Sequence, residues 1–225
     1  MRRIKAVLRL VTVAAVVAVL ASTIQIGGAF AATSSSPNLI VNPGAEAGAG
    51  SSNGGVVPVP SWQELTASTF TAVKYGATGG FPTKSSPGPA NRGKNFFAGG
   101  PDGTESATAV QVVKLSKYVT AIQAGKATFK LQGWLGGLGS KSDSGFIEID
   151  WKTGLRGHGT VTGSATLGPV TPAQRGDVTG LIAQATSGTV PKGTRSVLVQ
   201  LSLLGSGGSY NHGFADNLSL VLTTQ

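Results

Sequence analysis

Short segments in which apolar and polar residues alternate recur along the chain beyond Trp62, separated by clusters of Gly, Pro, Asp and Ser. They lie near residues 66–75, 95–98, 106–115, 127–135, 145–152, 159–170, 178–186, 195–204 and 214–223. Alternation with a period of two is typical of a β-strand that buries one face, because successive side chains point to opposite sides of a sheet. Regular spacing of such segments, with no helical intervals between them, predicts an all-β fold, either a sandwich or a barrel.

Three of these segments alternate regularly enough to assign their faces. Their apolar faces are predicted to carry Phe129, Leu131, Leu135, Ile147, Ile149, Trp151, Val197, Val199, Leu201 and Leu203. Trp134 falls on the opposite face of its segment, beside Lys130 and Gln132. An indole among polar side chains is unusual for a solvated strand face, so Trp134 is a candidate for binding.

Composition supports a loop-rich β fold. The chain has 34 Gly and 11 Pro among 225 residues, which argues against long helices. It contains no cysteine, which excludes disulfide frameworks, thiolate zinc sites, iron–sulfur clusters and cysteine nucleophiles. No heptad pattern or Gly-X-Y period is present, so a coiled coil and a collagen helix are also excluded.

The first 31 residues have the layout of a secretory signal peptide. Four basic residues precede an apolar run over residues 10–20, and Ala29-Phe30-Ala31 matches an A-x-A cleavage site. We therefore expect cleavage after Ala31, a secreted, extracellular protein and no stable membrane insertion afterwards. An uncleaved anchor is the alternative, because no charge occurs between Leu10 and Ala32, but the apolar run is short for a membrane span. Residues 32–37 are expected to form a short flexible tail, and residues 38–225 a single β-sandwich domain.

Charge gives a weaker indication of the partner. Without the four basic residues of the signal peptide, 14 Lys and Arg stand against 9 Asp and Glu. These cations are scattered singly along the sequence, with no basic stripe interleaved with aromatic residues, so nucleic acid is not an expected partner. The remaining positive charge is either an ordinary solvated surface or an attraction to anionic polysaccharide or cell wall.

Several residues form a candidate sugar site. An exposed aromatic ring stacks on the apolar face of a sugar while neighbouring polar groups bond its hydroxyls. We predict Trp134 and Phe146 as the stacking rings, and Asp143 of the polar turn 140–143 as a hydrogen-bonding group. The last long loop adds Tyr210, Asn211 and His212. The alternative is that the two rings cover a sheet edge or lie under a loop.

No catalytic residue is predicted. Residues 50–54 match G-x-S-x-G, but no helix signal follows, and the P-loop-like residues 88–95 lack the required Ser or Thr. The two histidines, His158 and His212, are too far apart for a helical zinc motif. Glu148 and Asp150 share one strand face, which leaves a hydrolase or lyase as a minor alternative.

Both ends of the predicted domain resemble a known family. The segment Asn38-Leu39-Ile40-Val41-Asn42-Pro43-Gly44-Ala45-Glu46, Pro60-Ser61-Trp62 and the closing segment Gly213-Phe214-Ala215-Asp216-Asn217-Leu218-Ser219-Leu220 carry this resemblance. They resemble galactose-binding-like β-jelly-roll domains, which include many secreted carbohydrate-binding modules and, distantly, F-box-associated sugar-binding domains. Residues 95–100, 133–137 and 167–170 are similar to uncharacterised bacterial secreted proteins of this architecture. The resemblance covers about residues 38–222 and implies a two-sheet antiparallel jelly roll.

The resemblance also implies a metal site and a function. In many members a Glu of the opening motif and an Asp just before the last strand help to hold a structural Ca²⁺, and Glu46 and Asp216 are the matching residues. Alternatively, both residues cap turns or pair with cations. The implied function is non-catalytic binding of a glycan or cell-wall polysaccharide, and a cell-surface or matrix adhesion protein is the alternative.

Overall fold

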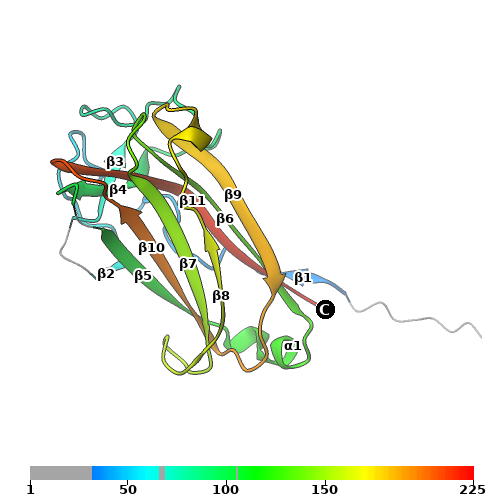
Figure 1. The fold of residues 1–225 in the computed structure, drawn as a ribbon. Helices are drawn as coiled ribbons and strands as arrows, with labels where there is room; N and C mark the ends of the chain where they lie inside the picture. Colours follow the sequence, from blue (N-terminus) through cyan, green and yellow to red (C-terminus); the bar gives the residue numbers. More distant parts are fainter. Residues whose placement is uncertain (1–31, 66–68, 105) are drawn as a thin grey trace, which may run out of the picture. The chain divides into compact units, whose positions relative to one another are not determined.

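The computed structural model describes residues 32–65, 69–104 and 106–225, so the predicted signal peptide lies outside the described residues. Two antiparallel sheets pack face to face, which confirms the predicted β-sandwich (Figure 1). Sheet A contains, in spatial order, β3 (Thr71–Lys74), β4 (Asn95–Pro101), β11 (Tyr210–Thr224), β6 (Ala127–Gly137) and β9 (Gly180–Thr189), with β1 (Ser34–Ser35) also paired to β11. Sheet B contains β2 (Gln63–Glu64), β5 (Ala107–Lys114), β10 (Ser196–Leu204), β7 (Ser144–Lys152) and β8 (Val161–Leu167).

Helical structure in the described residues is confined to short connections. The 3₁₀ turn η1 (Ser116–Tyr118) and the helix α1 (Val119–Gln123) join β5 to β6, and η2 (Ala173–Arg175) lies between β8 and β9. Within the described part of the chain, no helix has the length and apolar character that a membrane crossing requires.

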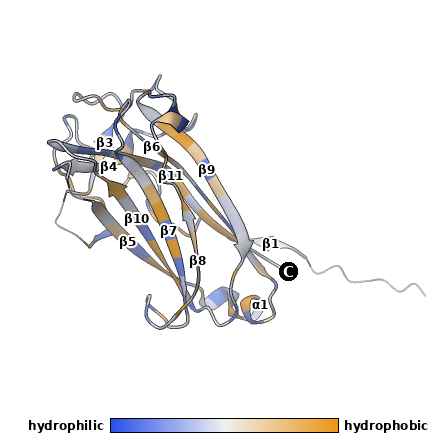
Figure 2. Ribbon diagram, viewed as in Figure 1, coloured by the Kyte–Doolittle hydropathy of each residue, from blue (hydrophilic) through white to orange (hydrophobic). Residues whose placement is uncertain are grey.

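The core between the sheets is formed by the predicted apolar faces. All ten residues assigned to those faces are buried, and the Phe129 ring lies 5.1 Å from that of Trp151, centroid to centroid. Polar positions interrupt the apolar ones along β7, as the alternation requires (Figure 2). Gly133 of β6 has no side chain on this face, and the side chain of Leu218 occupies that space. The sequence alternation therefore assigned the inner faces of β6, β7 and β10 correctly.

A second apolar cluster lies on the outer face of sheet A. We call it the outer cluster; it consists of Val73, Tyr75, Phe81, Phe96, Ala98, Leu181 and Phe214. The Phe96 ring lies 5.2 Å from Phe214 and 4.9 Å from Tyr75, centroid to centroid. These residues are buried although they lie on the face of sheet A that points away from sheet B, because a long connection covers this part of the face.

That connection is the loop of residues 75–94, which joins β3 to β4. It reaches across the sheet to the far strand, where Leu181 N–H donates to the Pro87 carbonyl at 2.9 Å. Arg92 stabilises the loop from within, since its side chain donates to the Thr83 and Pro89 carbonyls at 2.8 Å each. The loop therefore covers one half of the outer face of sheet A and leaves the other half open.

The opening segment follows the last strand. Leu39 N–H donates to the Leu220 carbonyl, and Leu218 N–H donates to the Pro43 carbonyl, both at 2.9 Å. Further towards the N-terminus, Ser34–Ser35 pair with Thr224 and Thr223 of β11. The expectation of a flexible tail over residues 32–37 is therefore corrected, because backbone hydrogen bonds to β11 fix part of this segment.

Candidate functional site

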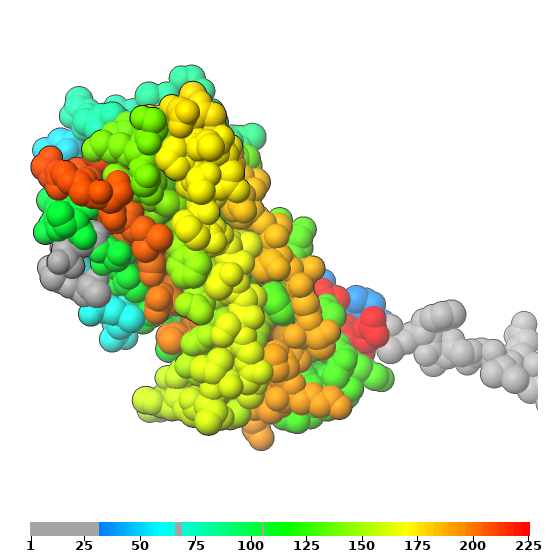
Figure 3. Space-filling view, viewed as in Figure 1, coloured from blue at the N-terminus to red at the C-terminus, as the bar shows by residue number. Residues whose placement is uncertain are grey.

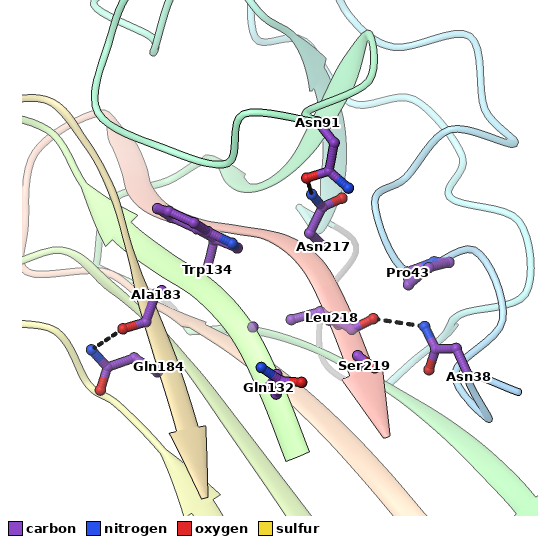
Figure 4. Close-up of a pocket in the computed structure, with 11 residues that line it drawn as sticks. Asn38, Pro43, Asn91, Gln132, Trp134, Ala183, Gln184, Asn217, Leu218 and Ser219 are labelled. Carbon is purple, nitrogen blue, oxygen red and sulfur yellow. Dashed lines mark hydrogen bonds between the residues drawn. The ribbon is translucent and has the colours of Figure 1, made fainter. Parts of the chain in front are cut away.

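A groove of about 390 Å³ opens on the uncovered half of the outer face of sheet A. Residues from three strands, the opening segment and the 75–94 loop line it: Asn38, Pro43, Asn91, Gln132, Gly133, Trp134, Ala183, Gln184, Asn217, Leu218 and Ser219 (Figure 4). None of these residues is charged. The groove is therefore a neutral polar site with one large aromatic wall.

An irregularity in β11 shapes the floor of the groove. The pairing of β11 with β6 shifts register between Asp216 and Ser219, and Asn217 within this bulge has a positive φ of 47°. Asn is among the few non-glycine residues that adopt this conformation readily. The Asn217 amide donates to the Asn91 amide oxygen at 2.9 Å, which connects the bulge to the covering loop. The bulge thus joins the floor of the groove to its rim.

Trp134 lies where the groove meets the outer cluster. It is half-buried, and part of its indole packs against the outer cluster while the rest lines the groove. Its indole N–H makes no hydrogen bond to the described residues. The prediction that Trp134 faces away from the core is confirmed.

Carboxamides supply most of the polar groups of the groove. Asn38 is fully engaged, since its Nδ2 donates to the Leu218 carbonyl and its Oδ1 accepts from two backbone N–H groups. Gln184 donates only to the neighbouring Ala183 carbonyl, at 3.0 Å. The Gln132 amide has no hydrogen-bond partner among the described residues. A carboxamide offers donors and an acceptor together, so Gln132 can bond a hydroxyl group of a ligand in either sense. Gln184 pairs with Gly133, which places its side chain on the opposite face of sheet A from Trp134.

Phe146 does not share a surface with Trp134. It lies half-buried on the outer face of sheet B. Alternation along β7 points Ile147 and Ile149 into the core and Phe146 away from it. Trp134 lies on the outer face of sheet A, so both sheets separate the two rings. The expectation that they form one stacking surface is wrong. Alternation places each ring outside its own strand but does not tell which sheet the strand joins.

Asp143 is completely buried rather than exposed in a polar turn. Its Oδ1 accepts from the N–H of Ser206, at 2.7 Å, and from the Ser206 hydroxyl. Its Oδ2 accepts from the backbone N–H of His212 at 2.9 Å. Asp143 therefore fastens the β6–β7 connection to β11 and to the segment before it, and both its oxygens already have partners.

Tyr210, Asn211 and His212 begin β11 and do not lie in a loop as expected. The Tyr210 hydroxyl donates to the Gly54 carbonyl at 2.9 Å, and burial raises the pKa of this phenol. Asn211 is buried, and its amide donates to the Leu203 carbonyl at 2.7 Å. The structure brings these three residues together with Asp143 but not into the groove, so their polar groups hold the β10–β11 connection.

His212 is a buried imidazole at the edge of the outer cluster. Its ring centroid lies 4.7 Å from that of Tyr210 and 5.8 Å from that of Phe81. Burial lowers the pKa of His212, and the positive charge of Lys141 lowers it further, whereas Asp143 acts in the opposite direction. The folded protein therefore favours the neutral imidazole.

Glu46 ends the opening segment, and Asp216 lies in β11, the strand along which this segment runs. Glu46 is exposed, and its Oε1 accepts from the backbone N–H groups of Lys94 and Asn95 at 2.9 and 2.8 Å. Asp216 is fully buried inside β11, where it accepts from the Tyr75 hydroxyl at 2.6 Å and from Asn217 N–H at 2.7 Å. Asp216 thus lies within the last strand and not before it.

The environment of Asp216 is unfavourable for an isolated negative charge. Burial raises the pKa of Asp216 to about 7, although hydrogen bonds from Tyr75 and Asn217 act to lower it. The negative charge of Glu46 raises the pKa further. No group of three or more His, Cys, Asp or Glu side chains that could hold a metal occurs among the described residues. Any cation here would depend on two carboxylates and backbone oxygens.

Glu148 and Asp150, the minor catalytic candidates, lie away from the groove. Asp150 lies on the outer face of sheet B, where Ser164 donates to its Oδ1 at 2.6 Å and Lys152 lies 3.2 Å from its Oδ2. Glu148 faces the same side, beside Gln200 and Thr166 in the strand register. This face is remote from the groove, because the core separates the two sheets.

The sequence interpretation missed most of the groove. Gln132 was recognisable, because it shares the outer strand face with Trp134. Gln184 and Asn217 needed the strand order, which places β9 and β11 on either side of β6. No sequence pattern indicated Asn91, since its position depends on how the 75–94 loop folds back over the sheet.

No protein-family model matches the chain, and no curated protein matches it by sequence. Among solved structures, the enzymatically active domain of bacteriophage CBA120 tailspike protein 4 is 13% identical over 81% of this chain and 21% of its own, with a TM-score of 0.49. A family 16 carbohydrate-binding module is 20% identical over 81% of this chain and 99% of its own, with a TM-score of 0.47.

A third similar structure is the K1 cleaved adhesin domain of Lys-gingipain from Porphyromonas gingivalis W83. It is 14% identical over 86% of this chain and 98% of its own, with a TM-score of 0.38. Modules of families 4, 6 and 22 are also among the structural neighbours. The two antiparallel sheets of the structure agree with the predicted sandwich, and these solved structures are what the chain is similar to.

Proposed function

We propose that this chain is a secreted, non-catalytic protein that binds a neutral glycan or polysaccharide in the groove beside Trp134. The observation that carries this proposal is the lining of the groove, which combines one partly exposed indole with five carboxamides and no charged residue. Neutral sugars present hydroxyl groups and apolar C–H faces, which carboxamides and an indole complement. A charged ligand would find no counter-charge in the lining.

The arrangement of the groove is suited to recognition. Trp134 and Gln132 project from the same face of β6, and the pairing of β6 with β9 and β11 holds them at fixed spacing (Figure 4). Asn38 is held by three hydrogen bonds, and Asn91 by its bond to Asn217. Side chains that are already ordered lose little conformational entropy when a ligand binds. The chain therefore offers a preformed site.

Trp134→Ala tests the proposal. We expect affinity for a neutral polysaccharide to fall by about 1–3 kcal/mol, or roughly 5- to 150-fold, because the substitution removes the stacking surface. Phe146→Ala is the matched control, since it removes a half-buried ring from the outer face of the other sheet. Binding should be measured on a polysaccharide array and then by calorimetry, with the melting temperature of each variant.

The outcomes separate the alternatives. Loss of binding in Trp134→Ala but not in Phe146→Ala supports the groove as the site. Equal binding by wild type and Trp134→Ala, or a wild type that binds no neutral glycan, overturns the proposal and favours the adhesion alternative, in which the sandwich contacts protein. Release of reducing ends from a bound polysaccharide would overturn the non-catalytic assignment.

A structural Ca²⁺ belongs to this proposal. Glu46 and the buried Asp216 would supply two carboxylate ligands, which suit a hard cation, and backbone carbonyl oxygens would complete the coordination. When bound, the ion would supply positive charge beside a carboxylate whose burial otherwise disfavours ionisation. Glu46 and Asp216 would hold it; Glu46 already links the opening segment to β4, and Asp216 links β11 to Tyr75 of the 75–94 loop. The test is the calcium dependence of stability set out in the Discussion.

A further inference from the structure

One end of the sandwich is strongly basic. Three connections close this end: residues 114–126 between β5 and β6, residues 152–160 between β7 and β8, and residues 190–196 between β9 and β10. Together they contain seven Lys and Arg residues and no Asp or Glu. We call these seven residues the basic end: Lys114, Lys117, Lys126, Lys152, Arg156, Lys192 and Arg195.

The fold brings these cations together from distant parts of the sequence. Ser196 pairs with Lys114 on one side and with Lys152 on the other, so the two lysines lie about 10 Å apart across three strands. Ser196 also holds the second connection, since its hydroxyl donates to the Gly154 carbonyl at 2.7 Å. Figure 3 shows the three connections side by side at the lower end of the domain.

Other members of the basic end lie beside Lys152 or beside one another. Arg195 N–H donates to the Lys152 carbonyl at 2.8 Å, which places this arginine beside the same strand end. The side chain of Lys192 lies over Gly125, where an added Cβ would be 3.2 Å from its Cε, and Lys126 follows directly. Pairing and contacts therefore bring cations from distant parts of the sequence to the same end of the domain.

These charges are available to a partner. Six of the seven side chains are exposed, and Lys152 is the half-buried exception, with Asp150 at 3.2 Å. Spacings near the screening length of about 8 Å at physiological salt make the fields of neighbouring cations overlap. Outside the basic end, the other seven Lys and Arg residues of residues 32–225 are outnumbered by nine Asp and Glu residues. The positive charge is thus concentrated at one end.

The surface chemistry favours an acidic polymer of sugars. Surfaces for single-stranded nucleic acid interleave cations with exposed aromatic rings for stacking, but Tyr118, the aromatic residue of these connections, is half-buried against the core. Membrane surfaces are bound by long amphipathic helices, whereas α1 has five residues and buries its Ile122. Charge alone, without stacking or insertion, suits a flexible, hydrated polyanion.

We propose that the basic end is a second binding site, separate from the groove, that takes an acidic polysaccharide such as a polyuronate. It binds through charge and without reading the identity of single sugars. This site does not depend on the groove, so a ligand can be held at both places, or at the basic end when the groove is empty.

The experiment measures binding of the purified protein to immobilised polygalacturonate, with dextran as the neutral reference. The test variant is Lys114→Gln/Lys117→Gln/Lys192→Gln, which removes three exposed charges from the basic end. The matched control is Lys74→Gln/Lys84→Gln/Lys94→Gln, which removes three exposed charges elsewhere and changes the net charge equally. We expect the test variant to bind about tenfold more weakly or worse, and its salt dependence to be less steep. We expect the control to change by less than about twofold, and Trp134→Ala to bind as wild type.

Other outcomes overturn the proposal. Equal weakening in both triple variants would show that net charge and not the basic end drives binding. A wild type that binds polygalacturonate no better than dextran would remove the site. Preferential binding to anionic phospholipid vesicles or to double-stranded DNA, at the same charge concentration, would show that the partner is a membrane or a nucleic acid instead.

Discussion

The two halves of the outer face of sheet A are built on the same sheet but differ in exposure, because a loop covers one half and leaves the other open. In the covered half, Phe96 and Phe214 are fully buried beneath the 75–94 loop. In the open half, Gln132 and Trp134 of β6 are only half-buried and line the groove. One strand, β11, contributes to both. A single sheet face therefore provides stability where a loop covers it and a binding surface where the loop ends.

The difference predicts which property each half controls. Burial of large apolar side chains contributes to the free energy of folding, whereas half-exposed side chains contribute little to it. Substitutions in the covered half should therefore change stability and leave affinity intact, and substitutions in the open half should do the reverse. Four measurements test this division, in order of decreasing expected effect.

Phe96→Ala should have the largest effect. Phe96 is fully buried and contacts Tyr75, Phe81 and Phe214, so its loss leaves a cavity that costs about 3–5 kcal/mol. For a domain of this size, that corresponds to a fall in melting temperature of roughly 6–20 °C. Urea unfolding followed by fluorescence measures the loss in the free energy of unfolding. Phe96→Leu is the milder variant if the alanine does not fold, and an unchanged stability in Phe96→Leu and in Phe96→Ala would contradict the importance of the outer cluster.

Calcium should stabilise the covered half at its border with the opening segment. If free Ca²⁺ is about 100-fold above its dissociation constant, binding adds about 2.7 kcal/mol, which raises the melting temperature by roughly 5–11 °C. Excess EDTA should reverse this in wild type. Asp216→Asn keeps the shape but removes a charged ligand, so its melting temperature should respond much less to EDTA. Identical melting of wild type in Ca²⁺ and in EDTA, with no metal in native mass spectra, would show that Glu46 and Asp216 hold no ion.

Gln132→Ala should affect binding alone. The Gln132 amide has no partner among the described residues, so its loss removes a hydrogen bond only from the complex. We expect glycan affinity to fall by about 0.5–1.5 kcal/mol, or roughly 2- to 12-fold, with an unchanged melting temperature. Lys130→Ala, two residues earlier on the same strand face and outside the lining of the groove, is the control. Calorimetric titration measures the difference, and equal affinities for Gln132→Ala and wild type would remove this residue from the site.

Mild acid should weaken the covered half slightly. Burial lowers the pKa of His212 below its ordinary value of 6.5, so the unfolded chain takes up a proton before the folded one does. Stability from this group is present above about pH 6.5 and is lost as the pH falls below it. His212→Gln should flatten the dependence of melting temperature on pH between about 7.5 and 5.5, whereas His158→Gln at an exposed position should not. A steeper dependence in His212→Gln would contradict the direction of the shift.

The sequence predicted the fold well because alternation is a local property. Ile147, Ile149 and Trp151 required only their own strand to be assigned to the core. The same rule placed Trp134 outside its strand, and the resemblance at both chain ends identified the architecture. Turn residues were less informative, since Asp143 occurs in a polar segment that the fold then buries beneath distant partners, Ser206 and His212.

Properties that depend on several strands were not predictable. Phe146 and Trp134 have similar local patterns, and only the strand order separates them. The same holds for charge, because Lys114, Lys152 and Arg195 are isolated in sequence and adjacent only through their pairing with β10. Local patterns therefore define faces, whereas surfaces that bind partners come from register and topology.

The position of β11 has a consequence for how the chain is made. This last strand lies in the middle of sheet A, between β4 and β6. During synthesis, β4 and β6 emerge long before the strand that joins them, so sheet A has two unconnected parts until residues 210–224 are available. Contacts between such distant segments carry a high loop-closure cost and form slowly. Sheet A, and with it the groove that Asn217, Leu218 and Ser219 line, can therefore be completed only when this strand is available.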